Sequence, residues 1–76
     1  MIPVIIPDLG EEIIKVQLVG WLVAEGQQLS EGEDIAEVVT DKAVFNIASP
    51  AAGVFLRKHY EAGAEIDVGT MIAEIG

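Results

Sequence analysis

The chain has 76 residues, 51% of them hydrophobic, so it is long enough for one small domain and too apolar for a disordered segment. Thirteen acidic residues against four basic ones give a formal net charge of −9, which argues against nucleic acid and anionic membrane surfaces as partners. With no cysteine and one histidine, the sequence offers neither disulfides nor a transition-metal site.

Short runs of β-branched and aliphatic residues alternate with turn residues along the first half of the chain. Pro3 and Pro7 bound the first run and favour an edge strand, and residues 8–12 form a loop. Gly20 is expected to bend the second run, and Gly26 to end it in a turn. The strands predicted in this half are 4–6, 13–23, 28–29 and 35–39.

The stretch 35–48 predicts a β-hairpin with Lys42 at its tip, because two apolar runs flank the four-residue connection 40–43. If Thr40 lies opposite Ala43, the register of the two strands is set. Directly opposed residues then have their side chains on the same face of the hairpin, and successive residues along each strand alternate between the two faces. One face is then apolar and the other polar, since Glu37 faces Asn46, and a one-residue slip would bury Glu37. The apolar face consists of Ala36, Val38, Phe45 and Ile47.

The second half of the chain continues the same pattern after a break at residues 49–53. Turn residues recur every few positions, and no segment has a sustained helical period. The remaining predicted strands are 44–48, 54–58, 65–66 and 71–75. The fold class indicated is therefore all-β.

An internal repeat spans both halves. A shift of 37 residues superimposes Gly26 on Gly63 and Gly32 on Gly69, and in each unit two residues separate the second glycine from an Ile-Ala-Glu sequence. Two β units this small cannot each bury an apolar face alone, but they can when packed face to face. The sequence thus predicts a sandwich or flattened barrel with internal two-fold symmetry, in which only the link between the repeats carries Asp-Lys-Ala.

The hairpin and its surroundings resemble a known family. Asp41-Lys42-Ala43, with Gly26 sixteen residues before the lysine and Gly53 eleven after it, is similar to the lipoyl domain of the acyltransferase subunit of 2-oxo-acid dehydrogenase complexes, within the biotinyl/lipoyl-attachment family. The segments 7–11 and 49–53 also match, so the resemblance covers the whole chain. It implies two four-stranded antiparallel sheets related by a pseudo-two-fold axis, with the hairpin at one end and both termini at the other.

The resemblance implies that a lipoate ligase or lipoyl transferase joins lipoate to Lys42 through an amide. The domain is then a carrier without catalytic residues of its own. Its flexible arm takes acyl groups and reducing equivalents between a thiamine-diphosphate-dependent 2-oxo-acid decarboxylase, an acyltransferase centre and dihydrolipoamide dehydrogenase. Tethering raises the effective concentration of the arm at each of these active sites.

The resemblance also implies roles for the residues around the lysine. Asp41 and Ala43 match the flanks of the modified lysine, and the loop 8–12 lies near that lysine and helps to choose the decarboxylase. Glu12 replaces a common glycine, and Val39 stands where glutamate is frequent, which leaves the identity of the complex open. The residues expected to take part in recognition are Gly26, Gly53, Glu11, Glu12, Val39 and Val44. The two valines are included because the hairpin register places them on the outer face, where either a partner or the loop 8–12 would cover them.

Residues 1–76 are interpreted as a single lipoyl-type domain, monomeric in isolation and N-terminal in a longer acyltransferase chain. The sequence has no signal peptide and no apolar run approaching about 20 residues. We therefore expect no membrane partner, and a location in the bacterial or archaeal cytoplasm or in the mitochondrial matrix.

Two other functions remain open from the sequence. A biotin carboxyl carrier shares the fold and the hairpin lysine, but its lysine usually sits between two methionines, whereas Met1 and Met71 lie elsewhere. An unmodified interaction module should lack the lysine or its Asp-Lys-Ala context. An enzyme is less well supported, because the chain has no nucleophile–base set.

Overall fold

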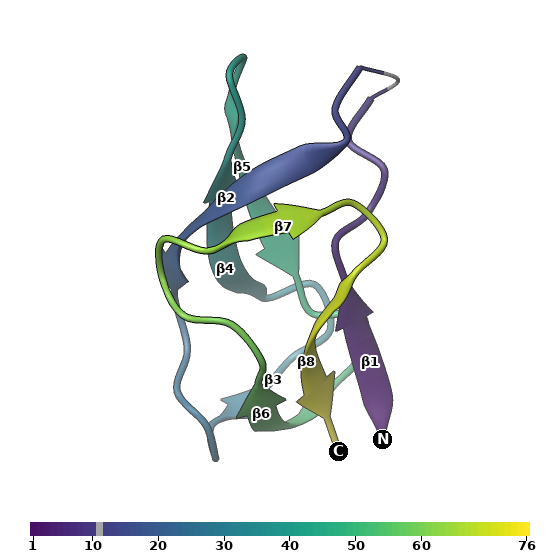
Figure 1. The fold of residues 1–76 in the computed structure, drawn as a ribbon. Helices are drawn as coiled ribbons and strands as arrows, with labels where there is room; N and C mark the ends of the chain where they lie inside the picture. Colours follow the sequence, from purple (N-terminus) through teal and green to yellow (C-terminus); the bar gives the residue numbers. More distant parts are fainter. Residues whose placement is uncertain (11) are drawn as a thin grey trace.

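The computed structural model describes residues 1–10 and 12–76, and within them every regular element is a β-strand (Figure 1). This confirms the all-β fold class. No helix among these residues is long and apolar enough to cross a membrane. The strands are β1 (Ile2–Ile5), β2 (Lys15–Trp21), β3 (Gln28–Leu29), β4 (Asp34–Val39), β5 (Val44–Ala48), β6 (Gly53–Lys58), β7 (Glu65–Asp67) and β8 (Met71–Ile75).

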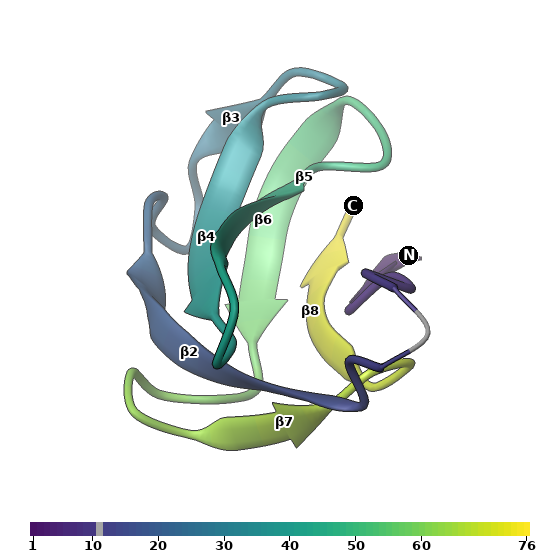
Figure 2. The same ribbon diagram turned by 90° about the horizontal axis from the view of Figure 1, so that it is seen from above.

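The strands form two four-stranded antiparallel sheets, with the orders β1-β8-β6-β3 and β5-β4-β2-β7. Moving every strand four places along the chain converts one order into the other, so the predicted two-fold symmetry is confirmed. The molecule measures 32 × 21 × 16 Å along its principal axes, and the strands curl around a common interior when seen from above (Figure 2).

The repeated glycines make the same hydrogen bonds in both halves. The Gly26 amide donates to the carbonyl of Phe55 at 2.7 Å, and the Gly63 amide donates to the carbonyl of Leu18 at 2.7 Å. Their φ angles are +92° and +96°, a left-handed conformation that glycine adopts without steric cost. The 37-residue repeat in the sequence is therefore a repeat of turn geometry as well.

The core lies between the two sheets and draws equally on both repeats. The aliphatic positions that match under the repeat are buried in each half, as for Ile35 with Ile72 and Val38 with Ile75. Phe55 is among the largest of the fully buried side chains, and the buried Ser49 hydroxyl donates to the carbonyl of Ala51 at 2.6 Å. The stability of the fold thus depends on apolar side chains of each half that are buried against those of the other half.

The structure moves the ends of two predicted strands by more than one residue, and those of three others, β4, β6 and β7, by one residue. β1 begins at Ile2 and contains Pro3, where the sequence predicted a strand at 4–6; the proline is tolerated because β1 is an edge strand, as expected. β2 is shorter than the predicted run 13–23, since Ile13 belongs to a turn in which its amide donates to the carbonyl of Gly10 at 3.1 Å. A register shift between Leu18 and Gly20 marks the expected irregularity in β2.

The hairpin and the chain ends lie at opposite ends of the molecule, as the resemblance implied. The connection between β4 and β5 lies at the top of Figure 1, and both termini lie at the bottom. The loop between β1 and β2 reaches the same end as the hairpin. This arrangement brings together two segments that are far apart in the sequence.

Replacing Val38 with aspartate should unfold the domain. The change removes about 1.5–3 kcal/mol of apolar burial and leaves an unpaired carboxylate between the sheets, against a total stability of about 5–15 kcal/mol. Ile72→Asp should do the same in the other repeat. Circular dichroism during thermal and urea unfolding measures the effect.

The matched control is Val44→Asp in the neighbouring strand, where the valine side chain is 58% exposed. Its stability should change by only about 0.5 kcal/mol. A cooperative transition for Val38→Asp near that of the wild type would contradict the assignment of the core.

Candidate functional site

The hairpin of β4 and β5 has the register predicted from its sequence. Val38 pairs with Phe45, Glu37 with Asn46, and Val39 with Val44. Val38 is fully buried and Phe45 is half-buried against the core, while Asn46 is exposed and Glu37 is partly exposed. The alternation of faces therefore continues up to the four-residue connection.

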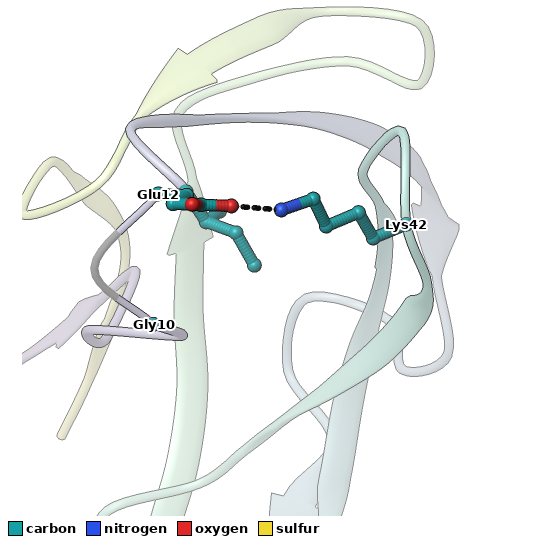
Figure 3. Close-up of a pocket in the computed structure, with 4 residues that line it drawn as sticks. Gly10, Glu12 and Lys42 are labelled. Carbon is teal, nitrogen blue, oxygen red and sulfur yellow. Dashed lines mark hydrogen bonds and ion pairs between the residues drawn. The ribbon is translucent and has the colours of Figure 1, made fainter.

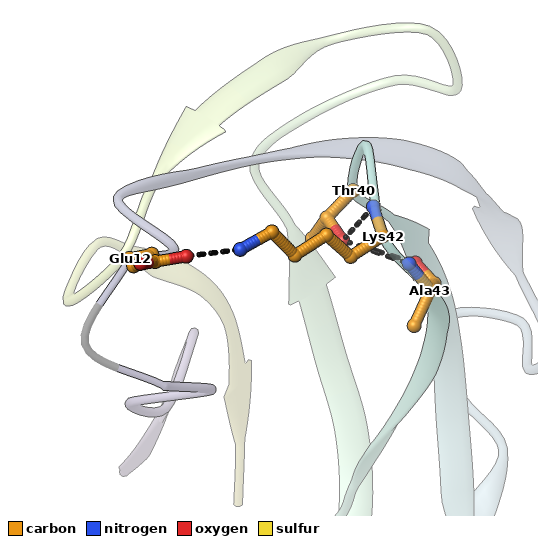
Figure 4. A network of polar contacts seen from close by, with 4 residues as sticks. All are labelled: Glu12, Thr40, Lys42 and Ala43. Atoms are coloured by element: carbon orange, nitrogen blue, oxygen red, sulfur yellow. Dashed lines mark hydrogen bonds and ion pairs between the residues drawn. The ribbon is translucent and has the colours of Figure 1, made fainter.

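The Thr40 hydroxyl organises the tip of the hairpin. Its oxygen accepts hydrogen bonds from the amides of Lys42 and Ala43, both at 3.1 Å, and the hydroxyl donates to the carbonyl of Ala43 at 3.2 Å (Figure 4). The Thr40 amide also donates to the carbonyl of Ala43, at 2.8 Å. The backbone of Lys42 is thus fixed by the residue two positions before it.

Thr40 is a site residue that the sequence analysis missed. The connection lacks the Asn-Gly or Asp-Gly pair of a tight hairpin, so composition alone does not indicate how it turns. The available signal was a threonine at the first position of the connection, because serine and threonine hydroxyls accept from amides two and three residues later.

Lys42 lies at the apex, and its side chain extends across to the loop between β1 and β2 (Figure 3). The Nζ atom forms an ion pair with the Glu12 carboxylate, and the two side chains are 55% and 77% exposed. The neighbours Asp41 and Ala43 are exposed as well. The structure therefore presents a primary amine at the end of the molecule, with a carboxylate as its partner.

The loop opposite the hairpin is held at its base. The Asp8 carboxylate accepts from the Gly10 amide at 3.0 Å, and the Ile13 side chain packs against the core. A groove of about 390 Å³ separates this loop from the hairpin and is lined by Gly10, Glu12, Ile13 and Lys42. Glu11, predicted from the sequence to take part in recognition, lies outside the described residues.

Val39 and Val44 pair next to the tip, as expected for the face that points away from the core. Val39 is half-buried and Val44 is exposed. Val39 also lines a second groove of about 410 Å³, together with Gln17, Asp41 and Glu65 among others. The structure thus brings Lys42, its two flanking residues, Glu12 and both valines to one end of the molecule.

Gly26 and Gly53 lie elsewhere, near the C-terminus. An added Cβ at Gly53 would lie 2.7 Å from the carbonyl oxygen of Gly76 and 2.8 Å from Ile75 Cγ2, so this position requires glycine for packing. Gly26 binds the carbonyl of Phe55, which pairs with Ile75. A role for these glycines in recognition stays a prediction, while the structure gives both of them a role in folding.

A metal site has no support in the part of the chain that the structure describes. No group of three or more histidine, aspartate or glutamate side chains gathers there in a way that could hold an ion. The charged groups that meet across the groove at this end of the molecule are the exposed amine of Lys42 and the carboxylate of Glu12.

Comparisons with known proteins agree on the family. The model of the biotin/lipoyl family, described as biotin-requiring enzymes, matches residues 2–75. The chain is 39% identical over 69 residues to the lipoamide acyltransferase component of a branched-chain alpha-keto acid dehydrogenase complex from Pseudomonas putida, covering 91% of this chain and 16% of that protein. It is 36% identical over 74 residues to the dihydrolipoyllysine-residue acetyltransferase component of the pyruvate dehydrogenase complex from Mycobacterium bovis, covering 97% of this chain and 13% of that protein.

A solved structure supports the fold independently. The lipoyl domain of the 2-oxoglutarate dehydrogenase complex from Azotobacter vinelandii superimposes with a TM-score of 0.78 at 22% identity, covering 100% of this chain and 96% of the other. The chain spans about a sixth or less of the length of the acyltransferase relatives above. With a family match over nearly every residue and this shared architecture, the chain belongs to the biotin/lipoyl family and has the lipoyl-domain fold.

Proposed function

We propose that this chain is a lipoyl carrier domain whose Lys42 receives lipoate through an amide bond. The observation that carries the proposal is the presentation of Lys42 at the tip of a hairpin whose backbone is fixed by Thr40. The family match and the acyltransferase relatives support a lipoate-binding carrier. The choice of Lys42 as the attachment point rests on geometry and on the Asp-Lys-Ala motif.

The residues present fit covalent attachment of lipoate at this position. Attachment requires a primary amine that an enzyme can reach from solvent. Of the three lysines, Lys15 and Lys58 lie within strands, where they pair with Asp67 and Ala73, whereas Lys42 lies in an exposed connection. A partner enzyme can therefore recognise Lys42 by its place on a rigid element.

In the attachment reaction the role of the domain is to expose the Lys42 amine to the modifying enzyme. Lys42 Nζ gives up a proton and forms the new amide bond to an ATP-activated carboxyl group, whose leaving group departs with the electrons of the broken bond. Lysine amines are protonated near neutral pH, so a ligase or lipoyl transferase supplies the base. The hairpin fixes the position of the Lys42 backbone, and the flexible lysine side chain extends the amine away from the domain surface.

Bound lipoate supplies a redox-active dithiolane that carries acyl groups and reducing equivalents. The domain holds this group on the tip, away from the core, where the active sites of other proteins can admit it. The partners are a thiamine-diphosphate-dependent 2-oxo-acid decarboxylase, an acyltransferase domain and dihydrolipoamide dehydrogenase. Tethering raises the local concentration of the arm at each site, which gives speed without tight binding.

Incubation with lipoate, ATP and a lipoate ligase should add one lipoyl group to the wild type and none to Lys42→Arg, as measured by intact mass. Arginine keeps the charge but cannot form the amide under these conditions. A parallel reaction with biotin and a biotin ligase distinguishes the sister function within the family. Biotin addition instead would assign the domain to carboxylases, and no addition in either reaction would refute a carrier function.

Lys42→Gln should leave the melting temperature nearly unchanged while abolishing modification. The lysine side chain is exposed and its ion pair with Glu12 is open to solvent, so its loss costs at most about 1 kcal/mol. Differential scanning calorimetry measures this shift. A drop of many degrees would mean that the residue supports the fold rather than the chemistry.

Thr40→Val should loosen the tip and slow modification of Lys42. Valine has a similar shape but lacks the oxygen that accepts from the amides of Lys42 and Ala43. Each lost hydrogen bond costs about 0.5–1.5 kcal/mol. Amide hydrogen exchange at these two residues should therefore speed up.

Thr40→Ser is the control for this substitution, because serine retains the hydroxyl. It should exchange as the wild type does. Equal exchange rates in all three proteins would show that the hydroxyl does not organise the tip.

A further inference from the structure

One polar contact joins the two segments at the functional end of the molecule. Lys42 from the hairpin and Glu12 from the loop between β1 and β2 are 30 residues apart in sequence and form an ion pair. Among the described residues, no other hydrogen bond or ion pair links residues 8–13 to residues 40–43. The charge on one side chain therefore controls the polar connection between these segments.

Each partner of the pair is anchored independently of the other. The Lys42 backbone is held by the Thr40 hydroxyl, and the loop is held by the Asp8–Gly10 hydrogen bond and by the packing of Ile13. The fold thus sets the spacing across the groove, and breaking the pair requires only side-chain motion. Loss of the contact should change the loop without unfolding the domain.

Acylation of Lys42 removes the charge on which this contact depends. An amide nitrogen carries no positive charge, so Glu12 loses its counter-charge when the amine is modified. The pair is neutral before acylation, and the same position carries a net charge of −1 afterwards. The modification thus changes the electrostatics of a loop that it does not touch covalently.

We propose that Glu12 is a positioning residue that holds unmodified Lys42 across the groove and releases it on acylation. Gly10, Glu12 and Ile13 then report the modification state of Lys42 to proteins that bind this end of the domain. A partner that presents a cation to the loop forms an ion pair with Glu12 more readily when Lys42 is acylated, because the lysine no longer competes for the carboxylate. The inference rests on the proposed function, because it takes Lys42 as the acylated residue.

The solvent exposure of the Lys42–Glu12 pair is consistent with a contact that breaks when a ligase acylates the lysine. Both side chains are largely open to solvent, and ion pairs of this kind shift an equilibrium by only about 1.5- to 5-fold. A stronger, buried pair would resist the ligase that has to reach the amine. A bias of this size favours binding of the acylated domain and leaves the unmodified domain open to the ligase.

The test compares the amide chemical shifts and hydrogen exchange of residues 10, 12 and 13 in five proteins. These are the wild type, Glu12→Gln, Lys42→Gln, Lys42→Arg and the wild type acylated at Lys42. The two glutamine variants and the acylated wild type should share one set of loop signals. The wild type and Lys42→Arg should share another, because arginine retains the charge.

Two further measurements separate the ion pair from a general structural effect. Acylation of Glu12→Gln should move the hairpin signals but leave the loop signals where they already are. Adding 1 M salt should move the wild-type loop signals towards those of Glu12→Gln, since screening weakens an exposed pair. The loop signals of Glu12→Gln itself should not respond.

The matched control is Glu65→Gln, which removes the same charge from another exposed pair. Lys15 and Glu65 lie 3.5 Å apart and are 53% and 71% exposed, close to the values for Lys42 and Glu12. This substitution should leave the amide signals of residues 10, 12 and 13 unchanged. Loop signals of Lys42→Gln or of the acylated wild type that coincide with those of the unmodified wild type would overturn the inference.

The arms of the experiment also separate this inference from the proposed function. If a ligase modifies Lys42 and the loop does not respond, the inference fails and the carrier function stands. If the loop signals shift in the glutamine variants but no ligase modifies Lys42, the ion pair exists but the domain is not a carrier. The proposal that the loop reports the modification of Lys42 is then wrong as well.

Discussion

The packing of two repeats against each other is the constraint on which the rest of the structure depends. Each repeat contributes an Ile-Ala-Glu strand, β4 in one sheet and β8 in the other, and Ile35 and Ile72 are fully buried between them. Both strands are central in their sheets, so each is paired on both sides. The hairpin that carries Lys42 begins with β4, one of these central strands. Pairing on both sides of β4 therefore holds the base of the hairpin in place.

This arrangement separates the residues that stabilise the fold from the exposed residues at the hairpin end of the molecule. The core is buried and apolar, whereas Asp41, Lys42, Ala43 and Glu12 are exposed and contribute little to stability. Exposed positions can therefore change without loss of the fold, which allows related domains to serve different complexes. The relatives named above belong to branched-chain and pyruvate dehydrogenase complexes, and the chain resembles both to a similar degree.

The sequence predicted most reliably what depends on local periodicity. The register from Ala36–Ile47 to Val39–Val44 followed from the alternation of faces, with Glu37 marking the solvent side. The pseudo-symmetry followed from a 37-residue repeat. The start of β1 was misplaced because an edge strand accepts Pro3. The ion pair between Lys42 and Glu12 could not be predicted from the sequence, because a contact between two long side chains 30 residues apart produces no local sequence pattern.

The two repeats match closely in the core but differ at the two ends of the molecule. The Ser49 amide bonds to the carbonyl of Glu33, and its counterpart in the other repeat is the bond from the Ile6 amide to the carbonyl of Thr70. At the hairpin end the chain continues from one repeat into the other through residues 40–43, whereas both termini lie at the opposite end (Figure 1). The link between the repeats is therefore the segment that exposes the Lys42 amine at the tip. Because the chain has only four basic residues, the proposed acylation of Lys42 would remove a quarter of its positive charge at the hairpin tip. The acylated end would therefore be more acidic than the unmodified one, and a partner with a basic surface would distinguish the two by charge.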